Sequence, residues 1–322
     1  MELRYTGQSP EAEISEQFGN WMEELFDVDE KVVYLDADLM GSLKTQELWK
    51  KRPDRVFNCG IQEANMVGVA AGLFLAGYKP FVHSFSPFIT RRVYDQVFLS
   101  VGYAHKSVHL IGSDAGIMAS ANGGTHMCFE DVALMRIIPG ACIVDVTDSV
   151  MFHSLLKETI DWPGVTYFRT PRRGAPDVYK RDTTFNIGQG HILTEGTDAT
   201  VIASGIMVAT ALEAQKILKA EGISIQVVDP ITIKPLDEEL VLRCAAETGA
   251  VVTAENHNII GGLGSAVAEL LAENHPVPIL RVGVCDCFGQ TGTVDFLRKE
   301  YHLQPEDIAE KVRKVIMLKK ER

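Results

Sequence analysis

Short apolar runs alternate along the first half of the chain with stretches in which apolar residues recur at helical spacing. Because strands and helices alternate, the pattern predicts an α/β fold with a mostly parallel sheet covered by helices on both faces. The runs that predict strands are residues 31–36, 79–83, 107–112, 141–145 and 165–168, and the stretches that predict helices are 66–72 and 88–103.

The alternation stops at a turn-rich segment, Thr170–Pro176, and then starts again. A chain of 322 residues suits two domains better than one. We therefore predict two α/β domains, residues 1–175 and 190–322, each with a mostly parallel sheet flanked by helices. In the second domain the predicted strands are residues 199–203, 224–228 and 250–254, and the predicted helices are 207–221, 237–248 and one that opens at 261–265.

Composition narrows the class of protein. The net charge is -12, so we expect no nucleic-acid partner. No uninterrupted apolar stretch reaches membrane-spanning length, and the first residues contain no apolar signal core, so we expect no membrane partner. The six cysteines form no Cys-x-x-Cys pair and are typical of reduced thiols. These features predict a cytoplasmic protein.

Glu63 is the first candidate for chemistry. It lies in Gly-Ile-Gln-Glu-Ala-Asn-Met, residues 60–66, between a strand-like turn and a helix of small residues. A buried carboxylate at a helix start is costly unless it has a partner, and a protonated ring nitrogen would be one. The alternative for this segment alone is a glutamate that only favours the helix dipole.

Three further segments carry candidate ligand groups. Residues 84–92 contain Phe85 and Phe88, which would serve either as core aromatics or as walls for a flat ligand. Residues 112–126 are rich in glycine and end in Gly-Gly-Thr-His126. The third segment, residues 169–173, supplies Arg169, Arg172 and Arg173, whose planar guanidinium groups suit anions.

These segments, in this order, resemble the pyrimidine-binding region of the transketolase family. Tyr94-Asp-Gln-Val97 also resembles deoxyxylulose-phosphate synthase, which uses the same cofactor. The resemblance implies that Glu63 bonds and protonates the aminopyrimidine of thiamine diphosphate, that Phe88 stacks on this ring with Phe85 nearby, and that Asp38 lies near the cofactor across an interface. His126 is then expected to contact the donor sugar and its intermediate.

The resemblance also implies a site for a sugar phosphate. Ser42 and the arginines Arg92, Arg169 and Arg172 match regions that hold the substrate phosphate. Two positions depart from the family: Asn122 replaces an aspartate that reads a sugar hydroxyl, and Ser113 replaces a histidine that helps to hold the phosphate. Because Asn donates as well as accepts hydrogen bonds, we expect an altered sugar preference.

The family binds the diphosphate and its metal through Gly-Asp-Gly followed by an Asn pair, and this chain contains no Gly-Asp-Gly. The ligands of Mg²⁺ (or Ca²⁺) are therefore expected on a separate N-terminal transketolase subunit. The chain is expected to self-associate to a dimer or to form a heterotetramer with that subunit. Its predicted activity is the transfer of a two-carbon ketol group from a ketose phosphate to an aldose.

Three alternatives stay open. The β subunit of a 2-oxoacid dehydrogenase has the same two domains but needs no arginine cluster for a sugar phosphate. A deoxyxylulose-phosphate synthase is normally one chain with its own Gly-Asp-Gly. A non-catalytic regulatory subunit would not need Glu63, Phe88 and His126 together.

In the second domain, Gly261-Gly-Leu-Gly264 opens a helix, and we favour close helix–sheet packing over an anion site there.

Overall fold

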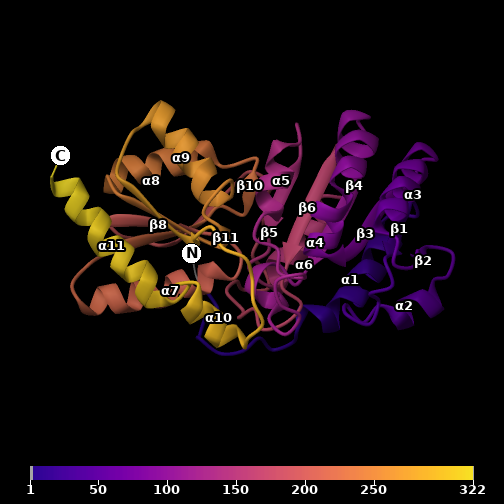
Figure 1. The fold of residues 1–322 in the computed structure, drawn as a ribbon, viewed down its shortest axis with the longest axis horizontal. Coiled ribbons are helices and arrows are strands. Elements are labelled where there is room, and N and C mark those ends of the chain that lie inside the picture. The colour runs from indigo at the N-terminus through magenta and orange to yellow at the C-terminus, as the bar shows by residue number, and fades with distance from the viewer. Residues whose placement is uncertain (1–2, 322) are drawn as a thin grey trace.

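The computed structural model describes residues 3–321 and contains two sheets that lie side by side (Figure 1). The first sheet has seven strands in the order β10-β5-β6-β4-β3-β1-β2, all parallel except β10, which is antiparallel to β5. Its strands are β1 Val32–Asp36, β2 Val56–Asn58, β3 Lys79–Phe85, β4 Val108–Ser113, β5 Cys142–Asp145, β6 Val165–Thr170 and β10 Thr232–Lys234. Strands β1, β4, β5 and β6 are buried along their whole length, which explains why their sequences are mainly apolar.

Helices cover both faces of this sheet. The predicted helix at 88–103 is broken once, at Thr90, whose backbone (φ -115°, ψ -84°) leaves the helical region. After the break the chain stays helical to Tyr103, first as a 3₁₀ turn and then as a π-helix. The α-helices are α1 Ile14–Val28, α2 Gln46–Lys51, α3 Glu63–Leu75, α4 Ser86–Ile89, α5 Asp131–Ile137 and α6 Ser149–Glu158. Two 3₁₀ turns, η1 Arg91–Val93 and η3 Gly116–Ala119, and a π-helix, η2 Gln96–Tyr103, complete the set.

The second sheet has five strands in the order β12-β11-β8-β9-β7, parallel except for β7, which is antiparallel to β9. Its strands are β7 His191–Thr194, β8 Ala199–Ala203, β9 Ile225–Asp229, β11 Val251–Asn258 and β12 Ile279–Val284. Its helices are α7 Met207–Ala220, α8 Glu238–Thr248, α9 Leu263–Asn274, α10 Val294–Glu300 and α11 Pro305–Lys320. The predicted fold class, two mostly parallel sheets flanked by helices, is confirmed.

The C-terminal half is not confined to its own sheet. Strand β10 extends the first sheet beside β5, and Lys234 donates from its Nζ to the carbonyl oxygens of Arg136 and Ile138. The alternating pattern did not reveal β7, β10 or β12, because these are edge strands and two of them have only three or four residues. The boundaries at residues 175 and 190 stay a prediction.

Within residues 3–321, no helix combines the length and the apolar character that a membrane span requires.

Candidate active site

Glu63 is the first residue of α3, and its side chain is only 3% exposed. Two neighbours donate hydrogen bonds to its carboxylate. The Ser84 hydroxyl, on β3, lies 3.0 Å from Oε1, and Nη1 of Arg92 lies 3.0 Å from both oxygens. These donors, one of them charged, offset the cost of burying the carboxylate.

Three rings form an aromatic wall beside this carboxylate. Phe85 ends β3, Phe88 lies on α4, and His126 follows the loop after η3. The His126 ring meets Phe88 at 5.0 Å and Phe85 at 5.8 Å between centroids, both edge to face. Cζ of Arg92 lies 3.7 Å from the Phe88 ring centroid, so the guanidinium links the wall to Glu63.

A second arginine, Arg172, lies close to the Phe85 ring. Cζ of Arg172 lies 5.5 Å from the Phe85 ring, and its Nε donates to Oδ2 of Asp114 at 2.7 Å. Its Nη1 donates to the carbonyl oxygen of Ser42 at 3.4 Å. The buried Ser42 hydroxyl has no hydrogen-bond partner within residues 3–321. The structure thus places the main chain of Ser42 beside Arg172, and the phosphate-binding role of both residues stays a prediction.

Arg172 also lines an open cavity of about 360 Å³ that includes the predicted residue Asn122. The cavity walls carry two cationic side chains, Arg172 and Arg173, and two acidic ones, Glu13 and Asp114. Because Asp114 already pairs with Arg172 at 2.6 Å from Nη2, an anionic ligand would have to share that guanidinium with a carboxylate. The cavity therefore presents charged groups of both signs to a ligand.

Arg169 lies elsewhere, against our sequence-based expectation of a phosphate ligand. It is 1% exposed and joins the two domains. Its Nε donates to Oδ2 of Asp131 at 2.7 Å, Nη1 lies 3.3 Å from Oδ1 of Asp145, and Nη2 donates to the carbonyl oxygen of Asn256 at 2.6 Å. All three nitrogens of its guanidinium group are engaged in this buried network, so Arg169 is not available as a substrate ligand.

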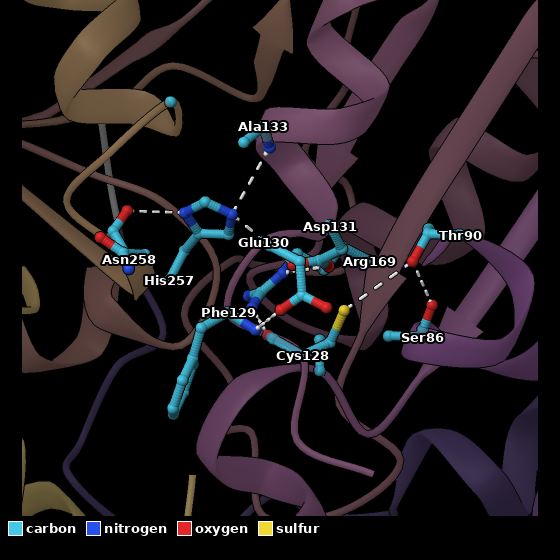
Figure 2. Close-up of polar contacts among 12 residues, drawn as sticks. Ser86, Thr90, Cys128, Phe129, Glu130, Asp131, Ala133, Arg169, His257 and Asn258 are labelled. Atoms are coloured by element: carbon cyan, nitrogen blue, oxygen red, sulfur yellow. Dashed lines mark hydrogen bonds and ion pairs between the residues drawn. The ribbon is translucent and has the colours of Figure 1, made fainter. Parts of the chain in front are cut away.

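Figure 2 shows the surroundings of this network. The His257 ring approaches Asp131, with 3.8 Å between Nε2 and Oδ1, and Nδ1 of His257 donates to the carbonyl oxygen of Asn258 at 2.7 Å. Burial lowers the pKa of His257 to about 4, so the ring is neutral at physiological pH. A neutral His257 adds no second cation to the pair of carboxylates that Arg169 neutralises.

Two more predicted residues lie apart from the aromatic wall. The Ser113 hydroxyl is fully buried and lies 3.0 Å from Nε2 of His83, whose Nδ1 lies 2.7 Å from Oδ2 of Asp36. Ser113 therefore belongs to an internal polar chain and does not face a substrate directly. Asp38 is exposed after β1 in a left-handed conformation (φ 63°) and accepts a hydrogen bond from Asn58. Its proposed place across an interface stays a prediction.

The glycines around the start of α9 serve both roles weighed for them. A Cβ on Gly264 would meet Thr253 and Arg281 side chains at 2.8 Å, which fits close helix–sheet packing. The backbone N–H groups of Leu263 and Gly264 also donate to the Glu255 carboxylate at 2.7 and 2.8 Å. The helix start thus holds an anion, but one from its own chain. Burial raises the pKa of Glu255 to about 7 despite these two donors.

Sequence reasoning missed Ser84 and Asp114, which orient Glu63 and Arg172 respectively. A signal was present, because Ser84 lies near the carboxyl end of β3 and Asp114 directly follows β4. In parallel sheets, polar residues at the carboxyl ends of strands gather at one edge, where ligands bind. Applied to every strand, that rule would have selected both residues.

The donor groups fit one part of thiamine diphosphate. A buried carboxylate beside aromatic rings suits a flat ring with a basic nitrogen. Within residues 3–321, no group of three or more His, Cys, Asp or Glu side chains is arranged to hold a metal ion. The residues around Glu63 therefore offer a fit for the aminopyrimidine, and the place of the metal ligands stays a prediction.

Family models match nearly the whole chain. The model described as "Transketolase, pyrimidine binding domain" matches residues 11–177, which is more than half of the chain. The chain belongs to the transketolase family. The model described as "Transketolase, C-terminal domain" matches residues 188–308 of the same chain. This confirms the family resemblance of the segments around Glu63, Phe88 and His126.

Similar proteins include subunits of two-chain transketolases. The 6-deoxy-6-sulfo-D-fructose transketolase subunit SqwH of Clostridium sp. (strain MSTE9) is 48% identical over 280 residues, which are 87% of each chain. An apulose-4-phosphate transketolase subunit of Phocaeicola vulgatus is 37% identical, over 84% of this chain and 86% of that one. A solved split-gene transketolase, an inactive β4 tetramer, is 42% identical with a TM-score of 0.89, over 95% of this chain and 99% of that one.

The alternative of a deoxyxylulose-phosphate synthase agrees less well with the comparisons. 1-Deoxy-D-xylulose-5-phosphate synthase of Heliobacterium modesticaldum is 36% identical over 89% of this chain, but the match spans only 44% of that enzyme. The chain shares both of its domains with these split transketolase subunits and matches them over most of both chains, so it is of the C-terminal subunit type.

Proposed function

We propose that the chain forms half of the active site of a thiamine diphosphate-dependent transketolase that moves a two-carbon ketol group from a ketose to an aldose. The observation that supports this most is the buried Glu63 carboxylate at 3% exposure beside the Phe85, Phe88 and His126 rings. The family membership makes the aminopyrimidine the natural ligand for this arrangement.

Each side chain has a defined task in this proposal. When bound, thiamine diphosphate supplies the nucleophile that takes up the two-carbon unit. Glu63 holds a proton at the pyrimidine nitrogen N1′, and the Phe88 ring supports the face of the pyrimidine, with Phe85 beside it. Nδ1 of His126 lies 2.9 Å from the Thr125 hydroxyl, which leaves Nε2 to bond a hydroxyl group of the donor sugar.

The other half of the site is proposed to come from an N-terminal subunit that binds the diphosphate with Mg²⁺ or Ca²⁺. An apolar surface supports such an assembly. Helix α3, which begins with Glu63, exposes Val69 and Leu75, and the adjoining η2 exposes Leu99 and Tyr103. Large exposed apolar side chains beside a half-built site are typical of a subunit interface. We propose that this surface supports a dimer of the chain or a heterotetramer with the partner.

The substrate is proposed to be a ketose with an anionic end group. Arg172, Arg173 and Asn122 share one cavity, and Arg172 reaches the aromatic wall through Phe85. The two similar split subunits are named for a sulfonated and for a phosphorylated sugar. Phosphate and sulfonate both offer several oxygens to a guanidinium group. With Asn122 at a position where an aspartate is usual, we expect xylulose 5-phosphate not to be the preferred donor.

Reconstitution tests this proposal. The chain is combined with a short protein that carries Gly-Asp-Gly and the Asn pair, and donors with phosphate, sulfonate and neutral ends are compared by kcat/KM. Arg172→Ala should raise KM for the anionic donors and leave kcat nearly unchanged, because it removes binding common to the ground and transition states. Arg181→Ala is the control, since Arg181 is 80% exposed and pairs with Glu11 away from the site.

A donor panel without preference for anionic ends would refute the proposed substrate class. If the chain, combined with an active partner, transfers no ketol group from any of the donors, the proposed reaction is refuted.

A cytoplasmic location is also proposed, on the ground that all six cysteines are free.

A further inference from the structure

We infer that Arg92 is a built-in substitute for the aminopyrimidine: in the cofactor-free chain its guanidinium group occupies the contacts that the cofactor ring must take, and cofactor binding displaces it. The inference rests on the proposed function, because it concerns the same carboxylate. It assigns to Arg92 a role other than the phosphate ligand that the sequence suggests.

The contacts of Arg92 reproduce the two features of the proposed pyrimidine site. Its Nη1 lies 3.0 Å from each Glu63 oxygen, and its planar group lies over Phe88 with 3.7 Å between Cζ and the ring centroid. A bound aminopyrimidine would likewise bring a flat, N–H-bearing ring to the carboxylate and to an aromatic face. Because both groups need the same oxygens and the same ring, they cannot both occupy these contacts.

Burial shows why such a substitute is useful. Without Arg92 and without cofactor, the Glu63 carboxylate would be buried with the Ser84 hydroxyl as its partner and with no cation. A buried carboxylate that lacks a cationic partner is destabilising. Arg92 supplies the cation until a cofactor ring replaces it.

The position of Arg92 also permits it to leave. Its side chain is 45% exposed, whereas that of Glu63 is 3% exposed. It lies on η1, which continues into η2, so the side chain can move while its backbone stays helical. A long side chain that is half in solvent can swing out at little cost in desolvation, while Glu63 stays in place.

Thiamine binding to the isolated full-length chain tests the exchange. Thiamine carries the aminopyrimidine without the diphosphate, so its binding needs neither the partner subunit nor a metal. Arg92→Ala should bind thiamine about tenfold more tightly than the unaltered chain, because no ion pair and no cation–π contact has to be broken first. Arg92→Lys should lie between the two, since an ammonium group pairs with Glu63 but stacks less well on Phe88.

Arg91→Ala is the matched control. Arg91 is the neighbouring arginine on η1, but it pairs with Glu130 instead of Glu63. This variant should bind thiamine like the unaltered chain. Equal or weaker thiamine binding by Arg92→Ala, or the absence of binding, would overturn the inference. Weaker binding would indicate that Arg92 keeps Glu63 in position for the cofactor.

Guanidinium ion provides a second measurement that does not depend on thiamine. In Arg92→Ala the ion should fill the vacated position between Glu63 and Phe88. It should then raise the melting temperature of this variant relative to sodium chloride at equal, low ionic strength, and it should compete with thiamine. Neither effect should occur in Arg91→Ala. A similar response of both variants would count against the inference.

The two proposals can fail separately. If Arg92→Ala gains affinity for thiamine but no reconstituted pair transfers ketol groups, the exchange stands and the proposed reaction falls. If the reconstituted enzyme is active and Arg92→Ala gains no affinity, the reaction stands and the exchange falls.

Discussion

Arg169 and Arg172 lie three residues apart, yet the structure predicts opposite consequences of replacing them. Arg169→Met removes the cation between Asp131 and Asp145 and the hydrogen bond to the Asn256 carbonyl oxygen. Removing one partner of a buried ion pair typically costs about 3–5 kcal/mol, because the remaining charge stays buried without compensation. Here two carboxylates lose their shared cation, so the cost belongs in this range.

The size of the temperature shift follows from chain length. With an unfolding entropy of about 2.1 cal/mol/K per residue, a chain of 322 residues has about 0.7 kcal/mol/K in total. The loss of about 3–5 kcal/mol then lowers Tm by about 4–7 °C. Because Arg169 bonds both domains, the calorimetric transition should also broaden or split as their unfolding becomes less cooperative.

Arg172→Met is the matched comparison. Its side chain is 22% exposed and pairs with a single carboxylate, Asp114. Asp114 is 6% exposed but lines the open cavity, so water can reach its carboxylate once Arg172 is removed, and Tm should fall clearly less than in Arg169→Met. Scanning calorimetry of both variants distinguishes the two roles. Two results would refute the assignment of Arg169 to the buried network between the two domains. One is a Tm of Arg169→Met within about 1 °C of that of the unaltered chain, and the other is a larger fall in Tm for Arg172→Met than for Arg169→Met.

Three further outcomes are expected. Glu63→Gln should abolish ketol transfer by the reconstituted pair while Tm stays within a few degrees, because an amide cannot hold the ring proton as a carboxylate does; activity within a few-fold of normal would contradict this. The isolated chain should bind thiamine diphosphate weakly, and the N-terminal partner with Mg²⁺ should tighten binding greatly in calorimetric titration; tight metal-dependent binding by the chain alone would exclude a shared site. The third outcome concerns Glu255, whose pKa burial raises to about 7. The unfolded chain releases this proton near pH 4.5, so the contribution of Glu255 to stability should decline between about pH 4.5 and 7, by about 3 kcal/mol at most. Glu255→Gln should therefore gain stability relative to the unaltered chain over this range in urea titrations, and a constant difference would show that the pKa is not raised.

The sequence by itself determined the architecture. Mostly apolar runs such as residues 32–36 and 108–113 form strands that are buried on both faces of a sheet, and such burial requires mainly apolar residues. It also indicated Glu63, because a carboxylate at the start of a helix of small apolar residues needs a partner wherever the helix packs. The short edge strands left weak signals, because an edge strand is paired on one side only and tolerates polar residues.

Only the tertiary structure decided what each arginine does. Arg169, Arg172 and Arg92 look alike in the sequence, since each follows or lies within an apolar stretch. Their roles depend on carboxylates that are distant along the chain: Asp131 and Asp145 for Arg169, Asp114 for Arg172, and Glu63 for Arg92. An ion pair is set by distance in space and by burial, neither of which is local in sequence. For the same reason the sequence left Ser113 as a substrate ligand, while folding placed its hydroxyl against His83 in the interior.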